Sequence, residues 1–326
     1  MAAKKIARPI FDNPFLNISV NPDNNSVERP PEARNPPNPD PNSNLSVLSK
    51  DVALDPNNKT WLRLYIPNRS ASPPPPASKI PLIFYYHGGG FVFCNADSSV
   101  YDVFCKGLVE KLGVMVISLD YRLAPEHRLP AAYDDAVDGF FWVRNTDDDW
   151  VTQLADLGNC YLCGTSAGGN LAYHAGLRFA AMAGELEPLT VRGMILHHPY
   201  FSGTKRTGSE QRLANDPLLP LYSIDQMFDL SLPKGVDHDH EYCNPMGNGG
   251  SEGLVEIRRL GWRIMVTGCF DDPLVDAGLD CAKVLEAKGL KIVKFFGDGY
   301  HGMEVFDPDM SGPLYDAIKE FIFSCA

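Results

Sequence analysis

Residues 160–170 read Cys-Tyr-Leu-Cys-Gly-Thr-Ser-Ala-Gly-Gly-Asn, with Ser166 at the centre of a G-x-S-x-G pentapeptide. An apolar run typical of a buried strand comes directly before the pentapeptide, and a helical pattern begins directly after it. A sharp turn from strand to helix strains the backbone of its central serine, so small flanking residues are needed to avoid clashes. The stretch therefore predicts a nucleophilic Ser166 presented above a sheet. The alternative is a glycine-rich helix start without chemistry.

Strand-like and helix-like segments alternate on both sides of this stretch. We expect strands at 60–66, 81–86, 114–119, 160–163, 193–198, 263–267 and 291–296, and helices at about 131–144, 167–182, 276–288 and 314–323. This alternation predicts an α/β fold with a mostly parallel central sheet and helices on both faces. The rhythm breaks between about 200 and 245, where we expect an insertion that caps the sheet.

The N-terminal segment has a different composition from the rest of the chain. More than half of the 27 prolines fall within the first 76 residues, which excludes a continuous helix or a central strand there. We expect residues 1–45 to form an irregular arm that contributes to the cap, and residues 46–326 to form the α/β domain that carries Ser166. The arm has apolar side chains that can pack against that domain, namely Ile10, Phe11, Phe15, Leu16 and Ile18.

The chain carries 41 acidic and 29 basic side chains, for a net charge of −12, which argues against a nucleic-acid partner. No apolar run is long enough for a signal peptide or a membrane-spanning helix, so we expect a soluble cytoplasmic protein, a monomer or a weak dimer without a membrane partner.

Eight cysteines are too few for a disulfide scaffold of this length. In a protein that is not secreted, the Asn-x-Ser/Thr triplets at Asn17, Asn44, Asn58 and Asn68 are chance matches.

A second glycine-rich segment, His87-Gly-Gly-Gly-Phe91, follows the buried strand expected at 81–86. Consecutive glycines allow several backbone N–H groups to converge on one point, as in an oxyanion hole. Gly88 and Gly89 are the expected donors, together with Ala167 after the nucleophile. A flexible loop and a phosphate cradle are the alternatives, although the Lys-Ser/Thr ending of a phosphate loop is missing.

A nucleophilic serine requires a general base and a carboxylate that orients the base. His301 follows the strand expected at 291–296 across a short loop, from which its imidazole can reach the end of the sheet. The loop after the strand at 263–267 offers three candidate carboxylates, Asp271, Asp272 and Asp276. The chain order is then Ser, Asp, His. A structural histidine and loop-capping aspartates are the alternatives.

Two pairs of residues invite a redox or metal interpretation, and we expect neither role. Cys160 and Cys163 would lie on opposite faces of one strand. The pair His197-His198 has no acidic or cysteine ligand at a supporting spacing. We therefore expect no metal and no cofactor.

Several other residues are expected to support or line the site. Arg122, in the segment 120–126, should pair with carboxylates and hold the loops under the site rather than act in catalysis. His238 and His240 of the insertion are expected to be solvated. A lid rich in Phe, Leu and Met predicts an apolar substrate pocket. Its candidate lining residues are Phe91, Phe93, Tyr200, Phe201 and Phe228.

From about residue 45 to its end, the chain resembles the plant carboxylesterases of the hormone-sensitive-lipase group, within the α/β-hydrolases. The resemblance rests on His-Gly-Gly-Gly-Phe at 87–91, Asp-Tyr-Arg-Leu-Ala-Pro-Glu-His at 120–127, Leu-Pro-Ala-Ala-Tyr-Asp-Asp at 129–135, Ser-Ala-Gly-Gly-Asn at 166–170, Asp-Pro-Leu-Val-Asp at 272–276 and Gly-Tyr-His at 299–301. It implies that Asp272, rather than Asp271 or Asp276, completes a Ser-Asp-His triad. It also implies that the arm and the insertion form a lid over the site.

The chain departs from the family pattern at two positions. Many relatives have Asp or Glu before the nucleophile, where this chain has Thr165, and many have a lid Trp where this chain has Phe228. The second change implies a roomier or differently shaped pocket. The family also contains gibberellin receptors, which have lost the catalytic histidine, so the presence of His301 favours an enzyme.

The combined expectation is a serine carboxylesterase that acts through an acyl-enzyme without a cofactor. Its substrates are expected to be small or medium uncharged esters, either plant specialised metabolites or xenobiotics. The alternatives are a small-molecule hormone receptor that does not hydrolyse its ligand, and a triad enzyme that catalyses elimination, cyclisation or acyl transfer.

Overall fold

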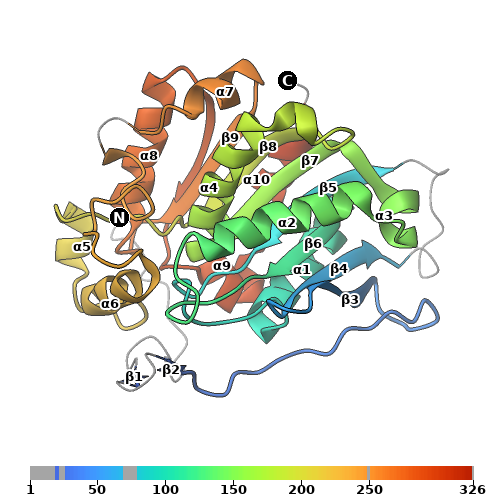
Figure 1. Ribbon diagram of the computed structural model, residues 1–326, viewed down its shortest axis with the longest axis horizontal. Coiled ribbons are helices and arrows are strands. Elements are labelled where there is room, and N and C mark those ends of the chain that lie inside the picture. The colour runs from blue at the N-terminus through green and yellow to red at the C-terminus, as the bar shows by residue number, and fades with distance from the viewer. Residues whose placement is uncertain (1–18, 22–25, 69–78, 248–249, 325–326) are drawn as a thin grey trace.

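The computed structural model describes residues 19–21, 26–68, 79–247 and 250–324. Its main sheet has eight strands in the order β10-β9-β8-β7-β5-β6-β4-β3 (Figure 1). The strands from β10 to β6 in this order run parallel, and β3 and β4 pair antiparallel beside β6. The strands are β3 Val47–Asp55, β4 Thr60–Pro67, β5 Ile80–Tyr86, β6 Met115–Asp120, β7 Ala155–Thr165, β8 Val191–His197, β9 Arg263–Cys269 and β10 Lys291–Gly297. The predicted α/β fold with a mostly parallel sheet is confirmed.

Helices cover both faces of this sheet (Figure 1). One face packs against α1 Ser99–Leu112, α9 Met303–Phe306 and α10 Gly312–Phe323; the other packs against α2 Ala131–Asn145, α4 Ala167–Ala181, α7 Leu254–Arg259 and α8 Val275–Ala287. Cys160 belongs to the apolar core on one face and Cys163 to the core on the other, so the two thiols point in opposite directions, as predicted. None of the described helices is long and apolar enough to cross a lipid bilayer.

Every strand and helix that we expected is present, and β7 extends further toward its N-terminal end than the apolar run indicated. Two large elements lie where we expected none, the edge strand β3 and the helix α1. The side chains of β3 are only partly buried over most of its length, which weakens the period-2 signal. The buried side chains of α1 recur every three or four residues, at Tyr101, Phe104, Leu108 and Leu112, so this helix was readable from its pattern.

The insertion between 200 and 245 contains α5 Gly208–Arg212 and α6 Leu221–Ser231. It covers the carboxyl end of β7, because side chains of the insertion share a cavity with Ser166. The described part of the N-terminal arm starts with the short pair β1 Ser19–Val20 and β2 Val27–Glu28. Arg29 then pairs with Glu126 at 2.7 Å, which fixes the arm to the loop after β6. The apolar residues predicted to anchor the arm, at positions 10–18, lie outside the described residues.

Candidate active site

Ser166 lies in the sharp turn between β7 and α4. Its φ of 57° and ψ of −117° are rare for a residue with a side chain. The turn requires small neighbours, since a Cβ atom on Gly164 would lie 2.0 Å from the carbonyl oxygen of Gly168, and one on Gly168 would lie 1.9 Å from that of Tyr86. The turn places the Ser166 hydroxyl at the carboxyl ends of the parallel strands.

Ser166, His301 and Asp272 form a continuous chain of hydrogen bonds. Ser166 Oγ lies 2.9 Å from His301 Nε2, and His301 Nδ1 lies 2.8 Å from Asp272 Oδ2. All three side chains are buried. Asp276 instead accepts a hydrogen bond from the backbone N–H of Ser209. Asp272 is thus the candidate carboxylate that contacts the imidazole.

The Asp272 carboxylate is held in its ionised form. Burial by itself raises its pKa, but the attraction of His301 and the hydrogen bonds from His198 and His301 outweigh burial and keep the pKa well below its usual range. Its other oxygen, Oδ1, accepts the backbone N–H of Leu274 at 2.8 Å. The carboxylate is therefore fixed on both oxygens and accepts hydrogen bonds only.

The glycine loop, residues 87–91, approaches Ser166 through Gly89 and Gly90. Both glycines line a cavity beside Ser166. Their φ angles of 107° and 62° are conformations that favour glycine. Gly88 is not among the residues that line the cavity, and its backbone is hydrogen-bonded to the Tyr101 hydroxyl. Of the predicted donors Gly88 and Gly89, the structure thus brings Gly89 to the cavity wall.

The cavity beside Ser166 is narrow, with a volume of about 20 Å³. A space of this size holds one or two water-sized groups. Its apolar walls come from Leu218, Leu219 and Met227 of the insertion and from Phe306 of α9. No lysine, arginine, aspartate or glutamate is among the described residues that line it.

None of the five aromatic residues predicted to line the substrate pocket is among the residues that line this cavity. Phe91, Phe93, Tyr200, Phe201 and Phe228 are all at most 3% exposed. Tyr200 and Phe228 stack with ring centroids 4.1 Å apart, and Phe91 packs edge-on against two tyrosines. The Tyr200–Phe228 stack joins the insertion to the end of the sheet, and the surface of these rings is removed from water.

The chain of hydrogen bonds continues beyond Asp272 into residues that the sequence did not connect with the site. Asp272 Oδ2 also lies 2.6 Å from His198 Nδ1, and His198 Nε2 lies 3.1 Å from Glu304 Oε2. The same Glu304 oxygen lies 3.3 Å from His197 Nε2, and His197 Nδ1 lies 2.9 Å from Thr165 Oγ1. The pair His197-His198 was visible in the sequence, but its contact with Glu304 depends on how α9 packs beneath β8.

These side chains also form the two groups in the described part of the chain that could hold a metal ion, His197-His198-Glu304 and His198-Asp272-His301. No acidic ligand stands at a supporting spacing in the sequence, but the fold brings Asp272 and Glu304 against the two adjacent histidines. Every ring nitrogen of the three histidines already has a hydrogen-bond partner. A metal ion would have to replace these bonds, so the arrangement suits a proton network better than a metal centre.

The surroundings of His198 favour its cationic form. Burial lowers its pKa, but the attraction of Glu304 and the hydrogen bonds to Asp272, Cys269 and Glu304 outweigh burial and raise the pKa well above its usual range. For Glu304, burial raises the pKa, but the attraction of His198 and the hydrogen bonds from both adjacent histidines lower it well below its usual range. The His198 imidazole is thus enclosed between two carboxylates, which favour its cationic form.

A polar network ties the insertion to the loop that carries Asp272. The Ser209 hydroxyl donates to the carbonyl oxygen of Pro273 at 2.7 Å, and the Ser209 backbone N–H donates to Asp276 Oδ2 at 2.7 Å. Ser209 and the neighbouring Glu210 are fully buried. Helix α5 is therefore fixed directly against the Asp272 loop.

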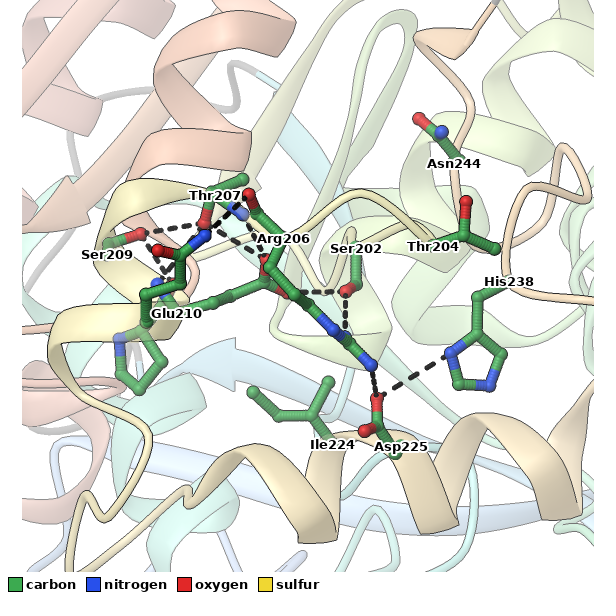
Figure 2. A network of polar contacts seen from close by, with 12 residues as sticks. Ser202, Thr204, Arg206, Thr207, Ser209, Glu210, Ile224, Asp225, His238 and Asn244 are labelled. Atoms are coloured by element: carbon green, nitrogen blue, oxygen red, sulfur yellow. Dashed lines mark hydrogen bonds and ion pairs between the residues drawn. The ribbon is translucent and has the colours of Figure 1, made fainter.

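Figure 2 shows how the same network reaches helix α6, with Arg206 extended between Ser202 and Asp225. Arg206 donates to Ser202 Oγ at 3.4 Å and pairs with Asp225 at 2.7 Å. His238 lies 3.6 Å from Asp225 and 2.8 Å from Asp229, with 14% of its side chain exposed. His238 thus lies partly exposed at the surface, where it belongs to this polar network. Arg122 pairs with the buried Asp135 at 2.7 Å, which confirms its predicted structural pairing.

Comparison with known proteins gives a consistent result. The family described as the alpha/beta hydrolase fold matches residues 83–304. Carboxylesterase 20 of Arabidopsis thaliana is 46% identical over 316 residues, which are 95% of this chain and 96% of that protein. The 3-O-acetylpapaveroxine carboxylesterase CXE2 of Papaver somniferum is 42% identical over 87% of this chain and 93% of its own length. Among solved structures, an esterase of Pyrobaculum calidifontis aligns with a TM-score of 0.67 and 27% identity, covering 84% of this chain and 85% of that one.

Proposed function

Because the chain belongs to the plant carboxylesterases of the hormone-sensitive-lipase group, in the α/β-hydrolase family, it is a carboxylic ester hydrolase. We propose that Ser166, His301 and Asp272 carry out the hydrolysis. The observation that supports these roles most directly is the 2.9 Å contact between Ser166 Oγ and His301 Nε2. The second imidazole nitrogen is bound by an ionised Asp272, which selects the tautomer that can accept a proton from the serine.

In the first half of the reaction, Ser166 Oγ attacks the ester carbonyl carbon while its proton passes to His301 Nε2. The tetrahedral intermediate then collapses, and the same proton is transferred to the leaving alcohol. An acyl group remains on Ser166. In the second half, His301 takes a proton from water as the water oxygen attacks the acyl carbon. The bond from that carbon to Ser166 Oγ then breaks, Ser166 regains its proton from His301, and the carboxylic acid is released.

The oxyanion is stabilised by backbone N–H groups of Gly89, Gly90 and Ala167. Gly89 and Gly90 replace the pair first expected, because they face the cavity and the backbone of Gly88 is engaged with Tyr101. Ala167 is the first residue of α4, so its N–H has no partner within the helix and lies where the helix dipole favours negative charge.

The substrate is an uncharged ester with a short acyl group. The wall formed by Leu218, Leu219 and Met227 is apolar, and the narrow cavity leaves space for an acetyl-sized group. The name of the poppy relative specifies an O-acetyl compound, which agrees with that size. Short-acyl esters of plant metabolites, and small foreign esters of the same shape, are therefore the proposed substrates.

The insertion and the N-terminal arm together act as the lid, over a catalytic domain that spans residues 46–326. The side chains of the insertion that wall the cavity, and the ion pair of Arg29 with Glu126, support this division. Longer substrates require these walls to move.

Kinetics of single-residue variants test the assignment. Replacing Ser166 or His301 with Ala should lower kcat on p-nitrophenyl acetate by roughly 10³ to 10⁶ without unfolding the protein. His240→Ala, which changes a histidine of the insertion outside the triad, is the control and should keep native turnover. Native turnover by Ser166→Ala would overturn the assignment.

A further inference from the structure

His198 has no role in the reaction described above, yet its backbone and its ring are both tightly constrained. It follows the end of β8 with a φ of 46°, and it is 1% exposed. A residue other than glycine keeps such a conformation only where its surroundings hold it there. The ring lies 2.6 Å from Asp272 and 3.1 Å from Glu304.

The titratable groups that face His198 come from every element packed around it. They are His197 of β8, Cys269 of β9, Asp272 in the loop after β9, His301 in the loop after β10, and Glu304 of α9. Both ring nitrogens of His198 point to carboxylate oxygens, which accept hydrogen bonds when ionised. An imidazolium satisfies both contacts, because it donates from both nitrogens.

We propose that His198 is a positioning residue of the ester-hydrolase site: it donates to Asp272 from one side while His301 donates from the other, and its charge offsets the two buried carboxylates. The inference rests on the proposed roles of Ser166, His301 and Asp272. His198 touches no reacting atom, so its effect on the reaction passes through Asp272 and His301.

The charges of the cluster explain why such a residue is useful. With His198 protonated, Asp272 and Glu304 leave a net charge of −1, and the proton that His301 receives from Ser166 brings the cluster to zero. Without the charge on His198, the same buried site would hold two uncompensated carboxylates, which is costly away from water. The cluster is thus electrically balanced in the state that follows proton transfer.

The same charge lies beside the base of the proposed reaction and repels a second positive charge there. The rings of His198 and His301 have centroids 5.3 Å apart. At that separation, one unit charge shifts the midpoint of a neighbouring protonation step by roughly 0.6 pH units in a water-like medium. At an effective dielectric constant of 20, the shift is roughly 2 pH units. Removing the cation should therefore move the acid limb of the kcat/KM profile to higher pH.

The test variant is His198→Asn. Asparagine tolerates a positive φ, and its amide can still donate to Asp272, so the substitution removes the charge while preserving the local geometry. We expect the acid limb of kcat/KM for p-nitrophenyl acetate to rise by at least about 0.5 pH units. The double variant His198→Asn/Glu304→Gln removes the cation and one carboxylate together, and it should return the limb toward the native midpoint. His174→Gln, at a buried histidine outside the network, should leave the limb unchanged.

A native acid limb in folded His198→Asn, or a double variant that shifts as far as the single one, would overturn the proposal. If His198→Asn does not fold, imidazole nitrogen NMR of the native protein decides the question. One ring should stay doubly protonated up to pH 8, and that signal should titrate at lower pH in Glu304→Gln. Only neutral rings at pH 8 would exclude the cation. Absence of ester turnover by the native protein would instead overturn the proposed function, while the NMR result still reports the charge of His198.

Discussion

Met227 lies so close to Gly90 that a Cβ atom on this glycine would come within 2.1 Å of the thioether sulfur. The contact joins helix α6 of the insertion to the glycine loop beside Ser166. Both residues line the narrow cavity, and Met227 is 1% exposed. One side chain of the cap therefore limits the size of the group that can lie next to the nucleophile.

Replacing Met227 with Ala should shift the acyl preference of the enzyme toward longer chains. Removing three side-chain atoms from the wall opens space that is now filled, and each additional buried methylene of a substrate is worth about 0.8 kcal/mol. We expect the ratio of kcat/KM for hexanoate over acetate esters of p-nitrophenol to rise about tenfold. Tyr222→Ala, on the exposed side of the same helix, is the control. An unchanged chain-length profile in Met227→Ala would show that the acyl group binds elsewhere.

Replacing Ser209 with Ala should loosen the loop that carries Asp272. The hydroxyl donates to the carbonyl oxygen of Pro273 in a fully buried position, and its loss leaves that oxygen without this partner. We expect the free energy of unfolding in urea to fall by about 1 to 3 kcal/mol, with a several-fold lower kcat. Gln211→Ala, at an exposed position of the same helix, should change neither quantity. If Ser209→Ala and the native protein have the same free energy of unfolding and the same kcat, the contact between the insertion and the Asp272 loop does not support the triad.

Replacing Gly168 with Ala should disrupt the turn at Ser166. The new methyl group would lie 1.9 Å from the Tyr86 carbonyl oxygen, and rigid backbone on both sides cannot make room for it. A loss of at least about 3 kcal/mol in stability, together with loss of esterase activity, is expected. Gly184 has no atom near the corresponding position, so Gly184→Ala should be close to neutral. Thermal unfolding compares the two variants. Equal melting temperatures for Gly168→Ala and Gly184→Ala would contradict the expected clash at Gly168.

Stability should fall as the pH drops from about 6.5 to about 4. Burial lowers the pKa of His87 and of His197 to about 4 and that of His174 to about 3. In this window the unfolded chain binds protons that the folded protein excludes, so each histidine removes up to about 1.4 kcal/mol per pH unit. His174→Gln should reduce the slope of unfolding free energy against pH by one such contribution. An unchanged slope would mean that this histidine is protonated in the folded protein.

The sequence was sufficient for the features that depend on local backbone chemistry. The turn at Ser166 needs small residues within two positions on either side, and such a requirement is visible in the order of residues. The strands and helices around it follow from the period of their apolar residues. His301 and the loop with the three candidate aspartates were reachable because each follows a recognisable strand of a parallel sheet, whose carboxyl ends meet at one edge. The choice of Asp272 among the three came from the family resemblance.

Features that depend on tertiary packing were not predictable in this way. Glu304 lies three residues after His301, yet its contact with His198 exists only because α9 packs beneath β8. Whether Gly88 or Gly90 donates to the oxyanion depends on the path of the loop, and the three candidate donors are all glycine, so the sequence does not distinguish them. Tyr200 and Phe228 were assigned to the pocket because aromatic residues suit both pockets and cores, and apolar character alone does not distinguish the two.

Intact-mass analysis after reaction with a fluorophosphonate probe shows whether Ser166 is the activated nucleophile. We expect one adduct per native molecule, located on Ser166, and no adduct on folded Ser166→Ala. His301→Ala should label much more slowly, because the base that takes the serine proton is missing. An unlabelled native protein that still hydrolyses p-nitrophenyl acetate, or a Ser166→Ala protein that labels at the native rate, would contradict the account.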